Sequence, residues 1–457
     1  MIKLTALVLS RRQFTITNAL LIILIIYLSG CATNKPYEIE LMPAPDVYEK
    51  GLIDPFSDRN PLKAIPYEGI LYATDRQPSD ADHHFYLNER GYLTRLGSAR
   101  IEMGPEGISW EEARRMSLLK NRTDKYPLKV VEVEELGILD KSMTVFTDPA
   151  IIPSDPRQPA ERFAGFINAK LNGSQRKDIY IYVHGYKVVF ENPLLVATEL
   201  WHFLGYDGVF IAYAWPSTPS RWAYFADIET AELTAHNLRL FLKYLAEETE
   251  AERIHIIGYS AGTRVVIATL AQLALLHAEQ DQSSIQNKLR IGHVILVGSD
   301  VDRQLFGAYL VDGLLKVPAT LSVYVSKSDR ALGISRWLFQ RDRLGQMWQG
   351  RPIPPATVDF LRRAENLHVI NVTEAEGAAT GNGHAYFRKS PWASSDILIS
   401  LMYDLKPADR GLEKEANLPV WTFPPDFIER LRKVLAAMNP DWAGARGKTV
   451  DRPAASD

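Results

Sequence analysis

The stretch from Asp178 to Val372 alternates short apolar segments with longer ones, and this alternation restricts the fold more than any other feature. Six apolar segments are predicted as strands, at residues 179–183, 208–213, 253–257, 291–297, 320–325 and 367–372. Longer segments at 193–204, 222–248 and 262–277 are predicted as helices. Strands that are apolar along their whole length are typical of sheets buried on both faces. The alternation therefore predicts an α/β fold, with a mostly parallel central sheet and helices on both faces.

More strands are predicted before this stretch, at residues 69–74, 84–87, 93–103 and 128–134, with a short helix at 110–119. Their close succession predicts antiparallel strands at the N-terminal side of the sheet. Late helices are predicted at 395–405 and 425–437. We expect one domain over residues 66–442, followed by a polar, disordered tail over 443–457.

The beginning of the chain has the features of an export signal. Arg11 and Arg12 precede an apolar run at 19–28, and this run is shorter than the about 20 residues of a membrane-spanning helix. It ends in Leu28-Ser29-Gly30-Cys31, which resembles the lipobox of bacterial lipoproteins. The resemblance implies a signal peptide over 1–30, cleavage before Cys31 and lipid attachment to that cysteine. The alternative is an uncleaved signal anchor.

A lipidated Cys31 implies a place in the bacterial cell envelope. Ala32, rather than an aspartate, follows the cysteine, which favours the outer membrane, with the protein facing the periplasm. Residues 31–65 are rich in proline and charge without clear periodicity, and they are predicted to form a tether between membrane and domain.

Composition excludes several other classes of site. Cys31 is the only cysteine, so the chain forms no intramolecular disulfide and no zinc site of several thiolates. A formal net charge of -3 gives no support for a nucleic-acid partner. There is no His-Glu-x-x-His pattern and no aspartate-rich calcium loop, so we expect neither a metal nor a cofactor.

The segment Gly258-Tyr259-Ser260-Ala261-Gly262 lies where a predicted strand ends and a predicted helix begins. In that context a G-x-S-x-G pattern is typical of a nucleophile elbow, a tight turn that presents the serine hydroxyl above the sheet. The helix N-terminus behind it favours developing negative charge. The pattern therefore predicts that Ser260 is a nucleophile, with an ordinary serine in a turn as the alternative.

A nucleophilic serine needs a base, and the base needs an acid that orients it. His384 lies in a glycine-rich loop after the last predicted strand, where the chain order serine, acid, histidine places the base. Asp329 follows the strand at 320–325, and Asp300 follows the strand at 291–297. We favour Asp329 as the acid because it ends the seventh strand of the expected order; Asp300 is the alternative.

Two N–H groups are expected to form an oxyanion hole. One belongs to Ala261, directly after the nucleophile. The other belongs to Tyr186, in the loop after the strand at 179–183, where Gly185 allows the backbone to approach closely. His184 is interpreted as a brace of this loop, with a role as base as the alternative.

Taken together, these segments resemble a family of bacterial α/β-hydrolases of unknown function with a lipase- and esterase-like core. The resemblance covers about residues 65–405, and it is carried by 72–76, 183–186, 215–217, the Ser260 elbow, 326–332 and 383–386. It implies an α/β-hydrolase fold and hydrolase chemistry, and it favours Asp329 and His384 as the triad partners of Ser260.

The expected reaction is cleavage of a small-molecule or lipid ester through an acyl-enzyme intermediate. Acyl transfer to an alcohol or amine at the same site is an alternative, and so is a non-catalytic surface lipoprotein that uses the fold for binding. Residues 336–362 lie between acid and base and are predicted to form either a lid or an ordinary helical excursion.

Overall fold

The computed structural model describes residues 37–51, 53–56, 60–80, 85–218, 224–333, 342–346, 354–416 and 418–438. The predicted signal peptide, Cys31 and the predicted tail lie outside these ranges. Within them, no helix is both long enough and apolar enough to cross a bilayer.

A single twelve-stranded sheet forms the centre of the domain, in the order β1-β4-β3-β2-β6-β5-β7-β8-β9-β10-β12-β11. The strands are β1 (Glu38–Glu40), β2 (Ile70–Pro78), β3 (Tyr86–Met103), β4 (Pro127–Ile138), β5 (Asp178–Val183), β6 (Val209–Tyr213), β7 (Arg253–Tyr259), β8 (Ile291–Val297), β9 (Thr320–Val325), β10 (Leu367–Asn371), β11 (Glu413–Lys414) and β12 (Val420–Thr422). Neighbouring strands from β2 to β12 along this order run parallel. The predicted mostly parallel sheet is confirmed.

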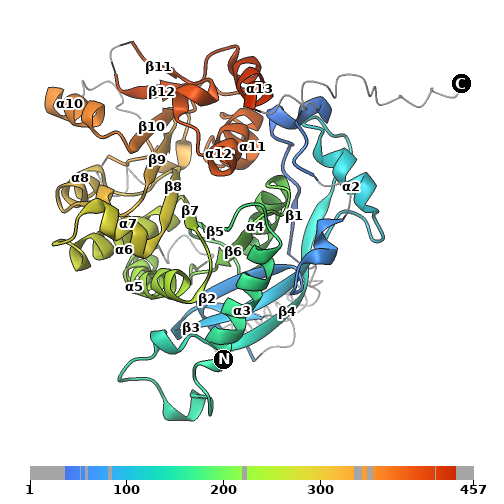
Figure 1. Ribbon diagram of the computed structural model, residues 1–457, viewed down its shortest axis with the longest axis vertical. Helices are drawn as coiled ribbons and strands as arrows, with labels where there is room; N and C mark the ends of the chain where they lie inside the picture. The colour runs from blue at the N-terminus through green and yellow to red at the C-terminus, as the bar shows by residue number, and fades with distance from the viewer. Residues whose placement is uncertain are drawn as a thin grey trace, which may run out of the picture. The chain divides into compact units, whose positions relative to one another are not determined.

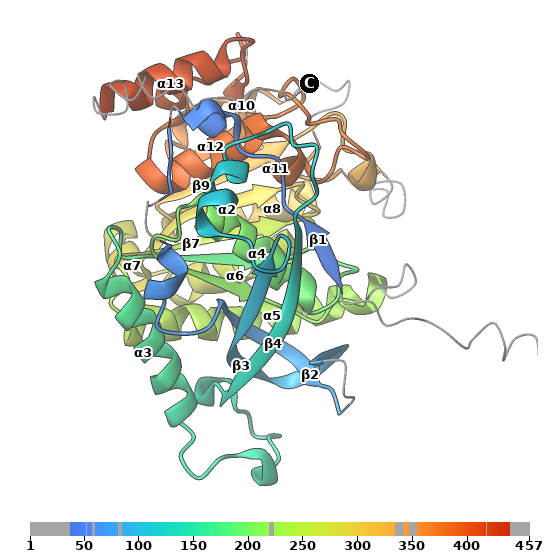
Figure 2. The same cartoon turned by 90° about the vertical axis from the view of Figure 1, so that its right-hand side faces the viewer.

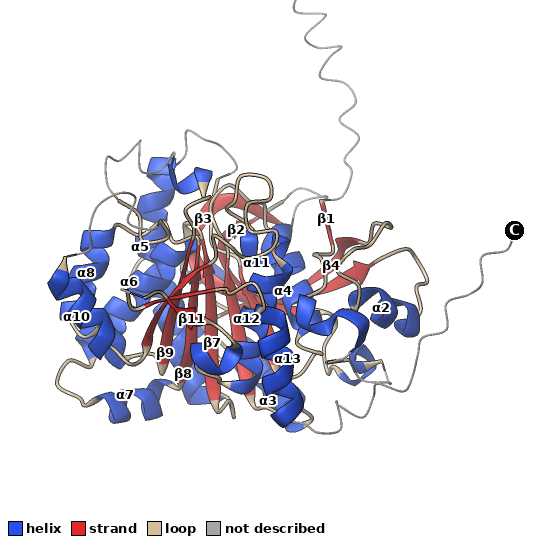
Figure 3. Ribbon diagram, turned by 90° about the horizontal axis from the view of Figure 1, so that it is seen from above, coloured by secondary structure: helices blue, strands red, loops and turns tan. Residues whose placement is uncertain are grey.

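Helices cover both faces of the sheet. They are α2 (Trp110–Ser117), α3 (Gln158–Asn172), α4 (Glu191–Phe203), α5 (Tyr224–Glu248), α6 (Gly262–Leu276), α7 (Gln282–Leu289), α8 (Arg303–Val311), α10 (Pro355–Arg363), α11 (Tyr386–Lys389), α12 (Pro391–Tyr403) and α13 (Phe427–Met438). Viewed from above, α5 and α6 lie on one side of the strands and α4 and α12 on the other (Figure 3). Because both faces are covered, β5, β6 and β8 are buried along their whole length.

The N-terminal strands are antiparallel, as predicted, but two predicted strands merge into one. β3 is 18 residues long and joins the end of the 84–87 segment, from Tyr86 onward, to the whole of the 93–103 segment (Figure 2). The residues between them have the composition of a turn. Gly91 instead lets β3 pass close to β2, since a Cβ there would lie 2.9 Å from the carbonyl oxygen of Arg76.

The tether predicted over 31–65 is wrong for most of its length, because the folded unit begins at Glu38. β1 pairs with β4, and a 3-10 helix, η1 (Asp46–Gly51), packs beside α12 (Figure 1). Val47 and Tyr48 are fully buried, and the Tyr48 hydroxyl donates to the carbonyl of Phe203 at 2.9 Å. These apolar residues enter the core from a short 3-10 helix, which is too short to produce a helical or strand periodicity in the sequence.

Two short strands at the far edge, β11 and β12, are absent from the sequence prediction. They have two and three residues, too few for a period-two pattern to stand out. β12 nevertheless extends the parallel sheet by pairing with β10.

His255, a buried histidine near the amino ends of the strands, is expected to make the free energy of unfolding depend on pH. Burial lowers the pKa of His255 from 6.5 to about 4, although Asp178 acts in the opposite direction. Between these two pKa values the unfolded chain binds a proton that the folded protein excludes. The contribution of His255 to the free energy of unfolding is therefore fully present above pH 6.5 and is lost as the pH falls toward 4. We expect a loss of about 3 kcal/mol from this group.

Urea unfolding of wild type and of His255→Gln across this pH range measures that loss. Glutamine keeps a hydrogen-bond acceptor for the N–H of His293, which now bonds Nδ1 of His255 at 3.0 Å, but it takes up no proton. The difference in stability between the two proteins should shrink as the pH falls. A constant difference would contradict the assignment.

Candidate active site

Ser260 occupies a strained turn between β7 and α6. Its φ angle is 52°, in the left-handed region that residues other than glycine rarely adopt, and its N–H donates to the carbonyl of Val297 at 2.9 Å. A Cβ at Gly262 would lie 2.3 Å from the carbonyl oxygen of His184, so the turn needs glycine at that position. The strand–turn–helix context that the sequence predicted for Ser260 is thus present.

The structure brings His384 and Asp329 to this serine. The Nε2 atom of His384 lies 2.8 Å from Ser260 Oγ, and its Nδ1 atom lies 2.7 Å from Asp329 Oδ2. Asp329 follows β9, and its Oδ1 atom accepts a hydrogen bond from the N–H of Leu332 at 3.0 Å. All three side chains are buried. Because the carboxylate accepts from Nδ1, the ring presents the lone pair of Nε2 to the serine hydroxyl.

Asp300, the alternative acid, contacts arginines instead of His384. Its Oδ2 atom accepts from Arg264 Nε at 3.0 Å, and its Oδ1 atom lies 3.3 Å from Arg343 Nε. Asp300 and Arg343 are both buried, so this ion pair joins the loop after β8 to the segment 342–346. Asp300 therefore forms ion pairs that connect parts of the fold, and it does not contact His384.

The backbone of Gly298 packs directly against the imidazole ring of His384. Its φ is 55°, and a Cβ at this position would lie 2.9 Å from Cε1 of His384. Any side chain here would push the imidazole away from Asp329. No local sequence pattern marks this glycine, because the contact joins residues that are far apart in the chain.

Tyr386 is a second residue whose role no local sequence pattern predicts. Its hydroxyl accepts from the N–H of Gly298 at 2.7 Å and donates to the carbonyl of Tyr324 at 2.8 Å. Tyr386 comes two residues after His384, so one buried hydroxyl ties the histidine loop to the ends of β8 and β9.

We expect Tyr386→Phe to lower stability by about 2 kcal/mol, because it leaves a buried N–H and a buried carbonyl without this partner. We also expect kcat for hydrolysis to fall about tenfold, since Gly298 no longer holds its place under His384. Tyr244→Phe is the matched control: its equally buried hydroxyl donates to the carbonyl of Ala160 at 2.6 Å, between α5 and α3. An equal kcat in both variants would rule out the positional role of Tyr386.

The expected oxyanion loop runs directly beside the nucleophile. A Cβ at Gly185 would lie 2.9 Å from Ser260 Cβ, so only glycine allows this approach. Tyr186 follows and is half-buried. Ala261 caps α6, where the first N–H groups have no acceptor within the helix. Both predicted donors therefore belong to backbone segments that flank Ser260.

His184 is fully buried in the same loop. Burial, together with the nearby charge of Arg76, holds the pKa of His184 well below its ordinary value. Its ring nitrogens face the carbonyl oxygens of Gly185 and Trp215, at 2.6 Å and 3.0 Å. These contacts agree with the interpretation that His184 supports the loop. The histidine that contacts Ser260 Oγ is His384, not His184.

The segment between acid and base is described in part. Residues 342–346 bond to the loops after β8 and β9, through Leu344 N to the carbonyl of Val301 at 2.9 Å and Ser326 N to the carbonyl of Gly345 at 3.1 Å. α10 covers the end of the predicted excursion 336–362. The other residues of the 336–362 segment lie outside the described ranges, so the lid and the helical excursion both stay predictions.

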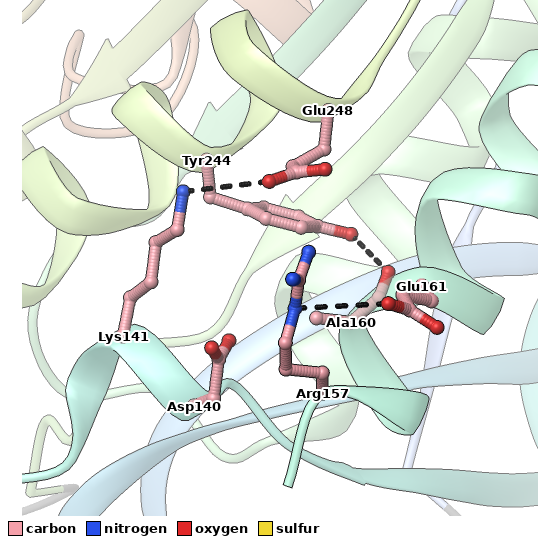
Figure 4. A pocket seen from close by; sticks show the side chains of 7 residues that line it. All are labelled: Asp140, Lys141, Arg157, Ala160, Glu161, Tyr244 and Glu248. Atoms are coloured by element: carbon pink, nitrogen blue, oxygen red, sulfur yellow. Dashed lines mark hydrogen bonds and ion pairs between the residues drawn. The ribbon is translucent and has the colours of Figure 1, made fainter.

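A separate cavity of about 330 Å³ lies near the C-terminal end of α5 (Figure 4). It is lined by Asp140, Lys141, Arg157, Ala160, Glu161, Tyr244 and Glu248. Its two cations face carboxylates of the same lining, at 3.7 Å for Lys141–Glu248 and 3.6 Å for Arg157–Glu161. Over the described part of the chain, no group of three or more His, Cys, Asp or Glu side chains could hold a metal ion.

The fold and the placement of Ser260 at a strand–helix turn define the protein as a member of the α/β-hydrolase class. A family model described as "Alpha/beta hydrolase of unknown function (DUF900)" matches residues 160–400, more than half of the 457-residue chain. The chain therefore belongs to this family, as the sequence resemblance predicted. No curated protein and no solved structure matches it significantly.

Proposed function

We propose that this α/β-hydrolase is a serine hydrolase that cleaves carboxylic esters through an acyl-enzyme intermediate. The observation that carries the proposal is the continuous chain of contacts from Ser260 Oγ to His384 Nε2, at 2.8 Å, and from His384 Nδ1 to Asp329 Oδ2, at 2.7 Å. A nucleophile, a base and an orienting acid within hydrogen-bond reach form the arrangement that activates a serine hydroxyl.

In the first half of the reaction, His384 Nε2 takes the proton of the Ser260 hydroxyl as Oγ attacks the ester carbonyl. The N–H groups of Ala261 and Tyr186 would stabilise the oxyanion. Asp329 stabilises the imidazolium that forms. Collapse of the tetrahedral intermediate expels the alcohol, which receives the proton from His384, and leaves the acyl group on Ser260.

In the second half, His384 removes a proton from water as it attacks the acyl-enzyme. The tetrahedral intermediate then expels Ser260 Oγ, which regains the proton from His384, and the carboxylic acid leaves. An alcohol or amine in place of water would make the protein an acyltransferase with the same first half. Product analysis with and without an added alcohol separates the two outcomes.

Labelling with a fluorophosphonate probe tests the proposal directly. Ser260 Oγ displaces fluoride from the probe only if His384 activates it, so full-length protein in detergent should carry one adduct. Peptide mass spectrometry should place it on the peptide that contains Ser260. Absence of labelling, or an adduct on another serine, would contradict the proposal and favour the non-catalytic alternative.

We also propose that the protein is anchored in the cell envelope through lipid on Cys31. Support comes from the lipobox-like segment that ends at Cys31 and the apolar run before it. Six residues, 32–37, separate Cys31 from β1, and they span at most about 25 Å if fully extended. The hydrolase domain would therefore lie close to the membrane surface, where lipid esters are within reach.

Replacing Cys31 by serine should abolish incorporation of labelled palmitate, because the acyl chains, which supply about 0.8 kcal/mol per buried CH₂, are attached to that cysteine. Undiminished incorporation of palmitate would contradict the proposal and favour the uncleaved signal anchor.

A further inference from the structure

Two sequence segments that take no part in the proposed chemistry meet at the loop beside Ser260. One is the end of β2 around Arg76, and the other is the segment 215–217 after β6. Thr74 Oγ1 donates to the carbonyl of Ala214 at 2.6 Å, so the two segments also hold each other. Both contact the loop 184–188, which contains the predicted donor Tyr186.

Arg76 holds the far end of this loop. Its guanidinium is fully buried, with Nη2 donating to the carbonyl of Val188 at 3.0 Å and Nη1 donating to Asn88 Oδ1 at 2.6 Å. The planar guanidinium spans from β3 to the loop with two donors in a fixed geometry. The neighbouring Asp75 accepts from Thr234 of α5 at 2.8 Å, which ties this end of β2 to the helix layer.

Trp215 holds the near end. Its Nε1 atom donates to the carbonyl of His184 at 2.6 Å, while His184 Nε2 lies 3.0 Å from the carbonyl oxygen of Trp215. The two rings stack at 5.4 Å between centroids. The loop between these two attachments includes Lys187 at a φ of 68°, a backbone conformation that needs support from its surroundings.

From these contacts we infer that Arg76 is a positioning residue, which holds the loop 184–188 so that the N–H of Tyr186 faces the carbonyl that Ser260 attacks. The inference rests on the proposed function. Arg76 acts through the carbonyl of Val188, two residues after Tyr186, and takes no part in proton transfer.

A displaced oxyanion donor lowers kcat and leaves substrate binding largely intact, because the donor bonds most strongly to the charge that develops in the transition state. Loss of one such donor costs about 10²–10³ in kcat, and partial displacement costs less. Lysine at position 76 keeps the charge but has no fork that bonds both Asn88 and Val188.

The test compares wild type, Arg76→Lys, the milder Asn88→Ala and Arg290→Lys in full-length protein. Arg290 is the matched control: it also donates to backbone carbonyls, at 2.6 Å to Ala251, but it directly precedes β8 and so lies at the amino ends of the strands, whereas Ser260 follows the carboxyl end of β7. Two quantities are measured: kcat and KM for a soluble ester, and amide hydrogen exchange in the peptide covering 184–190.

We expect Arg76→Lys to lower kcat about 10- to 100-fold with KM changed less than about threefold, and to speed exchange in the 184–190 peptide. Asn88→Ala should lower kcat about threefold to tenfold. Arg290→Lys should match wild type in both quantities. If Arg76→Lys fails to fold, Asn88→Ala decides, because it releases only one of the two guanidinium contacts.

Wild-type kcat and wild-type exchange in Arg76→Lys, or in Asn88→Ala where that variant decides, would overturn the inference, even if Ser260 is labelled normally. Failure of the proposed function has a different signature, since Ser260 in wild type would then not react with the probe. In that case normal exchange in the variants would still show that Arg76 does not hold the loop.

Discussion

Ser260→Ala is expected to lower kcat for ester hydrolysis by about 10⁶. The loss is large because the remaining groups act on a nucleophile that is no longer there: His384 has no proton to accept, and no acyl-enzyme forms. The variant should still fold, since Ser260 is held by its backbone N–H to Val297, which alanine keeps. Fluorophosphonate labelling and steady-state kinetics on the purified full-length variant measure this effect.

Ser400→Ala is the control for the loss of a buried serine. Ser400 lies in α12, where its hydroxyl donates to the carbonyl of Ile397 at 2.8 Å, and it takes no part in the site. Its variant should be labelled and should turn over ester like wild type. Full labelling of the Ser260→Ala variant would show that another residue is the nucleophile.

Asp329→Asn is expected to lower kcat by about 10⁴. The two carboxylate oxygens accept from Leu332 N–H and from His384 Nδ1, at 3.0 Å and 2.7 Å. Asparagine has one oxygen. If that oxygen keeps the bond to Leu332, the amide N–H₂ group faces Nδ1, the imidazole proton moves to Nε2, and the Ser260 hydroxyl loses its acceptor.

Asp300→Asn should behave in the opposite way. It breaks a buried ion pair with Arg343 and weakens the contact to Arg264, so we expect stability to fall by about 3 kcal/mol. Below its melting temperature, kcat should remain within about fivefold of wild type. Measuring kcat and urea stability for both variants distinguishes the two aspartates. A loss of about 10⁴ in Asp300→Asn alone would reverse the assignment of the acid.

Much of the fold could be predicted because its main signals are local. Buried parallel strands are continuous apolar runs, so β5 to β10 are visible in the sequence at nearly their observed bounds. The segments that were missed or misread follow tertiary contacts instead. Val47 and Tyr48 are buried from one short 3-10 helix, and Gly91 lies within β3, where glycine allows β2 to pass close to it.

At the site, Ser260 and His384 could be identified as candidates from the sequence, because an elbow between strand and helix and a glycine-rich loop after the last strand are features of neighbouring residues. Asp329 and Asp300 both remained possible as the acid. The folded chain shows which carboxylate contacts His384 and which contacts arginines, a difference that the sequence could not reveal because both aspartates follow strands of the same kind. The same holds for Arg76, whose contact with the loop beside Ser260 joins residues more than a hundred positions apart, and so depends on the order of strands in the sheet.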